Sequence, residues 1–252
     1  MVTGLEAAPL ALLIGLSLGA VGGGGSVLSV PVLVYLVGEG ARQATTTSLL
    51  VVGLAAAAGA LQHWRAGRVE VRAGALVGIC GVAGAVAGSW LGAHVPGRAL
   101  LLSFAALTAV VAVTLFARRA SGATAETAIG RRIIGRVLVG GTVIGLLTGF
   151  FGVGGGFLVV PALIFALGFP LPLAVGTSLL VIAMNSAVAL TTRLATTGVD
   201  WRVALPFAAA SLVGVLAGTA LAGRVDARLL TRALAFLLLG VAVFVGARTV
   251  AT

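Results

Sequence analysis

Long apolar segments, separated by short polar stretches, constrain this chain more than any other feature. Four of them approach or exceed the roughly 20 residues that a helix needs to cross a bilayer: 44–62, 73–92, 99–117 and 203–223. Of the 252 residues, 60% are hydrophobic and only 9% are charged, too few to cover the surface of a soluble domain of this size. The sequence therefore predicts an all-α, polytopic transmembrane protein.

The net charge of +10 does not indicate nucleic-acid binding. The basic residues, all of them arginines, gather between the apolar segments and form no patch on one amphipathic face. Basic residues in short loops are the usual topology signal of membrane proteins. We therefore expect the lipid bilayer, and no nucleic acid, among the partners.

The sequence repeats itself at an offset of 130 residues. Six positions of the first copy recur in the second: Gly15, Gly19, Gly22, Gly24, Gly25 and Pro31 become Gly145, Gly149, Gly152, Gly154, Gly155 and Pro161. The TSLLV block that begins at Thr47 likewise recurs from Thr177. A shared composition alone would not align identical residues at one constant offset across a whole half of the chain. We therefore divide the chain into a first repeat, 1–117, a polar linker, 118–132, and a second repeat, 133–252.

Each repeat predicts one glycine-broken segment followed by three ordinary spans. The broken segments are 5–37 and 133–168; the spans are 44–62, 73–92 and 99–117 in the first repeat and 173–192, 203–223 and 229–248 in the second. Residues 22–25 are consecutive glycines, each of which costs up to ~1 kcal/mol against alanine in a helix interior. Broken backbone at membrane depth survives where it is buried in protein or lines a watery cavity. We therefore expect each broken segment to be a helical hairpin whose pieces meet near the midplane.

The arginine distribution favours inverted repeats. The loop after the first ordinary span carries more arginine than the next loop in the first repeat, and this bias reverses in the second: Arg65, Arg68 and Arg72 against Arg98, then Arg193 and Arg202 against Arg224, Arg228 and Arg232. The positive-inside rule requires such a reversal if the repeats are inverted. Inversion predicts both termini outside the cytoplasm. The alternative, parallel repeats, follows if each broken segment crosses the membrane once.

Paired, glycine-broken segments at matching positions of two halves are typical of a transporter binding site. A helix that begins inside the membrane exposes free N–H groups and about half a positive charge, which favours an anion. Hydroxyl groups follow each break along the chain. The candidate substrate-binding residues are Gly24, Gly25, Ser26, Thr47, Ser48, Gly154, Gly155, Gly156, Thr177, Ser178 and Asn185.

A purely structural interpretation of these residues is also open. The glycine pairs at positions 15/19, 84/88 and 214/218 have the spacing of close helix packing. The threonines and serines suit helix capping, and Asn185 suits a bond to a neighbouring helix. His63 and His94 stand at span ends, where we expect a membrane interface.

Several function classes are excluded. Every acidic residue falls at a span end or in a loop, so a buried carboxylate relay for protons is missing. A P-loop needs a lysine, and the chain has none. One cysteine and two histidines assemble neither a metal cluster nor a nucleophile–base–acid set. We therefore expect no metal, no cofactor and no enzyme activity, and we hypothesise that any coupled proton moves with the substrate.

Two motifs resemble the sulfite exporter TauE/SafE family: GLSLGAVGGGGSVLSVPVL at 15–33 and GLLTGFFGVGGGFLVVPALIF at 145–165, each followed by an A-x-x-TSLL block. The resemblance implies a bacterial or archaeal inner-membrane permease that exports sulfite, sulfoacetate and related sulfur-containing anions, with the export coupled to protons. Its motifs map onto Gly22, Gly24, Gly25, Pro31, Thr47 and Ser48, and onto Gly152, Gly154, Gly155, Pro161, Thr177 and Ser178. Ser26 departs from the pattern, because the second copy has Gly156 there.

Together these observations lead us to expect a permease for a small anion, most specifically proton-coupled export of sulfite or an organosulfonate such as sulfoacetate. The alternatives are a passive anion channel and a membrane assembly factor without transport of its own. A homodimer is a candidate assembly, and the multi-pass inner membrane of a prokaryote is the expected location.

Overall fold

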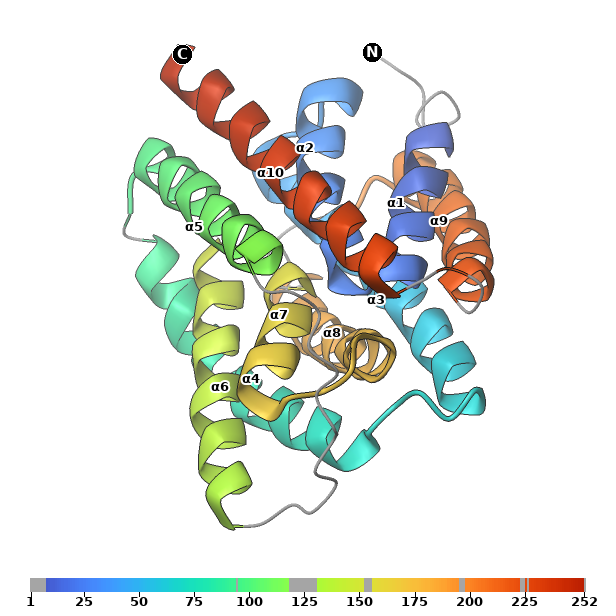
Figure 1. Cartoon of the computed structure of the whole chain (residues 1–252). Helices are drawn as coiled ribbons and strands as arrows, with labels where there is room; N and C mark the ends of the chain where they lie inside the picture. Colours follow the sequence, from blue (N-terminus) through green and yellow to red (C-terminus); the bar gives the residue numbers. More distant parts are fainter. Residues whose placement is uncertain are drawn as a thin grey trace.

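The computed structural model describes residues 8–93, 95–117, 131–151, 156–194, 198–222, 225 and 227–251. Within these ranges every regular element is a helix and no strand occurs, which confirms the all-α prediction (Figure 1). Four described stretches are long and apolar enough to cross a membrane: Gln43–Arg65, Val71–Gly88, Leu171–Thr191 and Trp201–Ala222. Shorter apolar stretches lie at Ala8–Val21, Gly25–Val37, Leu102–Thr114 and Ala235–Thr249.

Each of the six predicted ordinary spans is one continuous helix. In the first half these are α3 (Ala41–Arg65), α4 (Val71–Ala93) and α5 (Gly97–Ala117). In the second half they are α8 (Leu171–Leu194), α9 (Trp201–Ala222) and α10 (Ala227–Ala251). Each helix begins two or three residues before the predicted bound, because helix formation extends past the apolar stretch from which the bound was drawn.

The first-half broken segment consists of α1 (Ala8–Val21), the 3₁₀ turn η1 (Gly23–Leu28), the short α2 (Ser29–Val32) and the π-helical η2 (Leu33–Val37). The chain breaks at Gly22, whose φ of 75° is open only to glycine at low cost. The glycine run leads us to expect a regular helix that starts near Gly25. The 3₁₀ turn Gly23–Leu28 occupies this place instead, because the glycine run supports an α-helix poorly and Pro31 donates no hydrogen bond.

The second-half segment comprises α6 (Arg131–Phe151) and α7 (Gly156–Leu167). Residues 152–155, where the sequence predicts the second break, lie outside the described part of the chain, so the second break stays a prediction.

Helices of one half pack along helices of the other through small residues. α1 lies along α9, where Gly15 meets the Ser211 carbonyl and Gly214 meets the Leu12 carbonyl. α4 lies along α6 in the matching way, and the glycine contacts there are Gly84 with the Thr142 carbonyl and Gly145 with the Gly81 carbonyl. A Cβ atom at any of these glycines would collide with backbone, so the prediction that the spaced glycines serve packing is confirmed.

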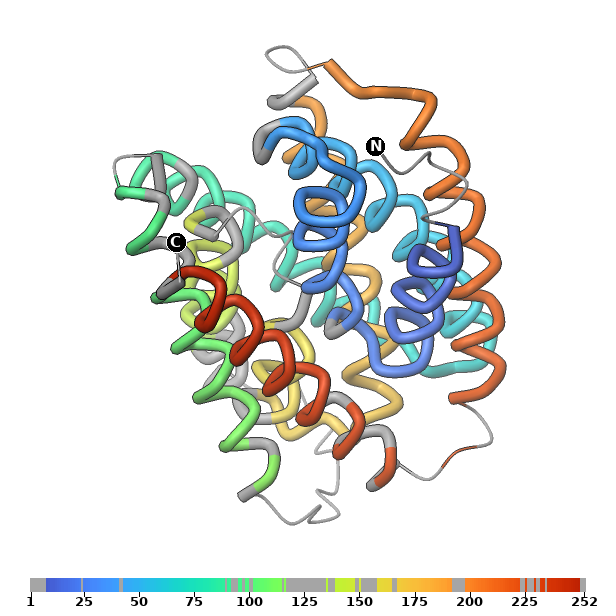
Figure 2. Tube along the Cα trace, turned by 90° about the horizontal axis from the view of Figure 1, so that it is seen from above, coloured from blue at the N-terminus to red at the C-terminus, as the bar shows by residue number. Residues whose placement is uncertain are grey.

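Corresponding helices of the two halves run antiparallel. In the α3–α8 pair, Gly53 contacts Ser186 while Gly59, further along, contacts Leu179. In the α5–α10 pair, which lies side by side in Figures 1 and 2, the Phe116 and Phe236 rings are 4.9 Å apart. Inverted repeats require equivalent helices to run in opposite directions, as the helices of these two pairs do, and the inversion itself stays a prediction.

Helices α3 and α8 form the centre of the molecule. Their spanning stretches are 61% and 56% buried, against 39% for α4 and 44% for α9. Leu18 of α1 and Val215 of α9 pack against them in one apolar cluster. The hydroxyl motifs that begin at Thr47 and Thr177 therefore lie on the two most enclosed helices.

Candidate functional site

The break at Gly22 lies against the hydroxyl motif of the other half. A Cβ atom at Gly22 would stand 2.7 Å from Ser178 Oγ and 2.9 Å from Val160 Cγ2. Ser178 belongs to α8 and Val160 to α7, both in the second repeat. Along the chain each break is followed by the hydroxyls of its own half, whereas the packing joins the first break to the second motif. The candidate site is therefore built from both halves.

Beyond the break, the chain folds back on α1. Gly25 is buried and contacts Ser17 Oγ and the Leu18 backbone nitrogen. Ser26 is fully buried, and its hydroxyl donates to the Gly23 carbonyl at 2.6 Å. The two pieces thus form the predicted hairpin, with Gly24 inside the 3₁₀ turn. The second-half counterparts Gly154 and Gly155 lie outside the described residues.

The hydroxyl motifs do not cap their own helices, which corrects the capping interpretation. Thr47 and Thr177 lie inside α3 and α8, past the first turn of each helix. The Thr177 hydroxyl instead accepts a hydrogen bond from the Glu70 backbone N–H at 3.0 Å, just before α4 begins. Ser178 donates to the Val175 carbonyl at 2.7 Å. Both side chains are buried, so Thr177 fastens the α3–α4 connection to the start of α8.

The first-half motif contacts an acidic residue. The Thr47 hydroxyl donates to Glu39 Oε1 at 3.3 Å, and Ser48 beside it is buried. Glu39 stands in the connection before α3, outside the spans. Burial raises the pKa of the Glu39 carboxyl, the bond from Thr47 lowers it, and the charge of Asp200 from the second half raises it. This acidic group is absent from our candidate residues, because along the chain it lies in a loop.

Asn185 lies apart from the glycine break. It is seven residues beyond Ser178, which places it on the same face of α8 but about 10 Å further along the axis. Its side chain is 7% exposed, and its Oδ1 has no hydrogen-bond partner. The neighbouring atoms include Gly81 of α4, where a Cβ would be 3.4 Å from Asn185 Nδ2. The structure therefore separates Asn185 from the residues at the break.

His63 is buried, which corrects the expectation of an interfacial side chain. It is only 1% exposed, and its Nε2 lies 3.2 Å from the Gly19 carbonyl in the last turn of α1. A histidine at a span end normally suggests the interface. No local signal in the sequence reveals this burial, because α1 and α8, which are distant from His63 in the sequence, supply the covering atoms.

A small cavity adjoins His63. It has a volume of about 30 Å³, and its lining comprises Ala20, His63, Arg68, Leu171, Pro172, Val175, Ala222 and Val225. This volume holds one or two water molecules, since one needs roughly 10–15 Å³ measured in this way. The lining joins the end of α3, the start of α8 and the end of α9 next to the Gly22 break.

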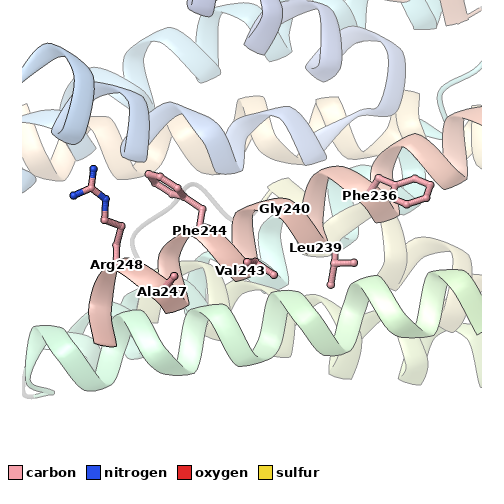
Figure 3. A pocket seen from close by; sticks show the side chains of 7 residues that line it. All are labelled: Phe236, Leu239, Gly240, Val243, Phe244, Ala247 and Arg248. Atoms are coloured by element: carbon pink, nitrogen blue, oxygen red, sulfur yellow. The ribbon is translucent and has the colours of Figure 1, made fainter. Parts of the chain in front are cut away.

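A larger groove lies on the outer side of the molecule and is mostly apolar. About 460 Å³ in volume, it runs between α10 and the first-half broken segment, with Tyr35, Phe236 and Phe244 in its lining. Figure 3 shows Phe244 and Arg248 on the side of α10 that faces this segment; the Arg248 guanidinium lies 5.9 Å from the Tyr35 ring centre. These exposed aromatic side chains suit lipid chains better than a small anion.

Hydroxyls and backbone N–H groups supply the chemistry at the break, and such groups can bind a small anion by hydrogen bonds. The Thr47 hydroxyl of the candidate set already donates to the Glu39 carboxyl group. In the part of the chain that the structure describes, no three His, Cys, Asp or Glu side chains come close enough to hold a metal ion.

Comparison with known proteins gives a consistent answer. Residues 7–245 match the family described as Sulfite exporter TauE/SafE. A probable membrane transporter protein of Xylella fastidiosa (strain 9a5c) is 36% identical over 240 residues, which cover 92% of this chain and 91% of that protein. The probable membrane transporter protein YdhB of Bacillus subtilis (strain 168) is 27% identical over 176 residues, 68% of this chain and 70% of that protein. No solved structure matches the chain.

The family match and the relatives agree with the apolar helices of the fold. They identify a multi-pass membrane transporter and not an enzyme. Because the match extends over nearly the whole sequence, the chain belongs to the sulfite exporter TauE/SafE family.

Proposed function

We propose that this transporter carries out proton-coupled export of sulfite, or of an organosulfonate such as sulfoacetate, across the inner membrane of a prokaryote. The observation that carries the proposal is the contact of the Gly22 break with Ser178, which brings the first break to the buried hydroxyl motif of the second half. The substrate-binding residues in this proposal are those predicted from the sequence.

A sulfur oxyanion fits this chemistry. Its oxygens accept several hydrogen bonds, and backbone N–H groups at a helix break supply them without a cationic side chain. Ser26, Ser178 and the glycines contribute small groups, which let an anion approach the backbone closely. Glu39 is the acidic group beside this set, and burial raises the pKa of its carboxyl, which favours the neutral form that does not repel an anion.

Inverted repeats would give such a site access to both sides of the membrane in turn. Transporters of this design rock one repeat against the other around a site near the midplane. The antiparallel α3–α8 and α5–α10 contacts support this arrangement. The glycine contacts between α1 and α9, and between α4 and α6, bring the helix backbones of the two halves close together, and we propose that the relative movement of the halves occurs at these contacts.

The test is sulfite flux into proteoliposomes that contain the purified protein, with and without a pH gradient. We expect accumulation against the sulfite gradient, lost in Gly24→Leu and Gly154→Leu. Gly240→Leu is the matched control, because a Cβ at Gly240 meets no atom within 4 Å. Downhill flux alone would replace coupled export with a passive channel. If the purified protein gives no flux of sulfite, sulfonates should be tried next, and failure of both would refute the proposed substrates.

A further inference from the structure

His63 is a titratable side chain enclosed at the centre of the fold. It belongs to the last turns of α3, yet it is 1% exposed because α1, α8, α9 and the α3–α4 connection cover it. Its neighbours Trp64 and Arg65 are exposed. A buried histidine beside the membrane-embedded break of a transporter is therefore placed where a proton could influence the site.

The contacts of His63 define which of its nitrogens can take up a proton. Nε2 lies 3.2 Å from the Gly19 carbonyl oxygen, which only accepts hydrogen bonds, so Nε2 carries the hydrogen of the neutral ring. Nδ1 is then the basic nitrogen, and it is buried without a hydrogen-bond partner. Protonation adds a hydrogen at Nδ1 and leaves the bond to Gly19 in place. The adjoining cavity has room for a water molecule to deliver that proton.

We propose that His63 is the proton-binding residue through which this transporter couples anion export to protons, with Nδ1 as the atom that carries the proton. The inference rests on the proposed function for its biological meaning. It replaces the hypothesis that a proton travels only on the substrate.

The surroundings of His63 explain how proton and anion would depend on each other. Among the described residues, α1, α8 and α9 contribute only apolar side chains to the cavity, and Arg68 is the charged group in its lining. Glu70 lies on the same connection and is held through its backbone by Thr177. A protonated His63 thus adds a second positive charge beside Arg68. An anion at the break relieves this repulsion, so proton binding and anion binding strengthen each other by the same factor.

The position of His63 connects it mechanically to the break. Its partner Gly19 stands three residues before Gly22, and Val175 lines the cavity while also contacting Gly22. A positive charge at Nδ1 therefore changes the electrostatic surroundings of the segment that turns at Gly22. The corresponding residue of the second half is Arg193, which carries a permanent charge. Only the first half has a proton-dependent group at this position.

The first experiment compares His63→Gln with His94→Gln in the sulfite flux assay. Glutamine keeps an N–H that can donate to the Gly19 carbonyl but does not titrate, and His94 is the other histidine of the chain. With one proton per anion, a pH difference of about one unit accumulates sulfite about tenfold in the native protein and in His94→Gln. We expect His63→Gln to lose this accumulation while it still exchanges labelled sulfite at equal concentrations. Unchanged accumulation in His63→Gln would overturn the inference.

The second experiment does not depend on the substrate. Histidine labelled with ¹⁵N gives signals from only two residues, and His63→Gln assigns them. We expect the neutral His63 ring to carry its hydrogen on Nε2 and to take up a proton at Nδ1 as the pH is lowered. A hydrogen on Nδ1 in the neutral ring, or a ring that stays neutral throughout, would refute the role of His63. If His63 titrates but the native protein moves no sulfite, the proposed substrate is wrong and the proton site stands.

Discussion

Replacing Gly22 by alanine tests whether the first glycine break is packed against α8. Gly22 has φ 75° and ψ −144°, a conformation that is nearly restricted to glycine. The added methyl group would also stand 2.7 Å from Ser178 Oγ and 2.9 Å from Val160 Cγ2. The substitution therefore combines backbone strain with overpacking.

The magnitude follows from these two contributions. Backbone strain costs ~1–3 kcal/mol and overpacking a further ~1–3 kcal/mol, so the folded state should lose ~2–6 kcal/mol. Gly38→Ala is the matched control, because Gly38 also has positive φ, 84°, but a Cβ there meets nothing within 4 Å. It should lose only the ~1–2 kcal/mol that a left-handed conformation costs an ordinary residue.

The assay is thermal unfolding of the purified variants in detergent, followed by sulfite flux for those that remain folded. Gly22→Ala should unfold at a clearly lower temperature than Gly38→Ala. Adding Ser178→Ala to Gly22→Ala removes one of the two close contacts and should restore part of the loss. Equal unfolding temperatures for the two single variants would refute the packing of the break against α8.

Four further predictions concern a buried carboxyl group, a hydrogen bond between helix ends, an unpartnered amide oxygen and the membrane side on which two loops lie. Burial raises the pKa of Glu39, so the folded chain holds this proton more tightly than the unfolded chain, and stability falls as the pH rises through the raised pKa. Glu39→Gln should therefore unfold at a higher temperature than the native protein at about pH 7 and at nearly the same temperature at about pH 4, below the ordinary carboxyl value; a constant difference would contradict this. Thr177→Val leaves the Glu70 N–H without its acceptor and should cost ~1–3 kcal/mol, whereas Thr177→Ser should unfold like the native protein. Asn185→Leu removes a buried oxygen that has no partner, so stability should be kept or raised, and a loss of sulfite flux in this stable variant would assign Asn185 to the substrate. In a Cys80→Ala background, Arg65→Cys and Arg224→Cys should both react with a membrane-impermeant thiol reagent from the cytoplasmic side; labelling from opposite sides would exclude inverted repeats.

Local features of the sequence determined the class of fold. Apolar length predicted the helices, and the small-residue spacing at 15/19, 84/88 and 214/218 predicted close helix packing. The glycine run predicted the break that the structure places at Gly22. These properties depend on neighbouring residues along the chain: hydrophobic length and backbone preference are local quantities, so they can be read without knowing which helices touch.

Only the tertiary structure decided which groups meet. It packs Gly22 on Ser178 of the opposite half and encloses His63 between helices that are distant in sequence. It also brings Glu39 to Thr47 and separates Asn185 from the break. Burial and contact at these positions depend on how α1, α3, α8 and α9 cross, and crossing is set by side-chain packing over the whole bundle. A span-end histidine and a loop glutamate therefore looked ordinary in the sequence, although the fold places both beside the candidate site.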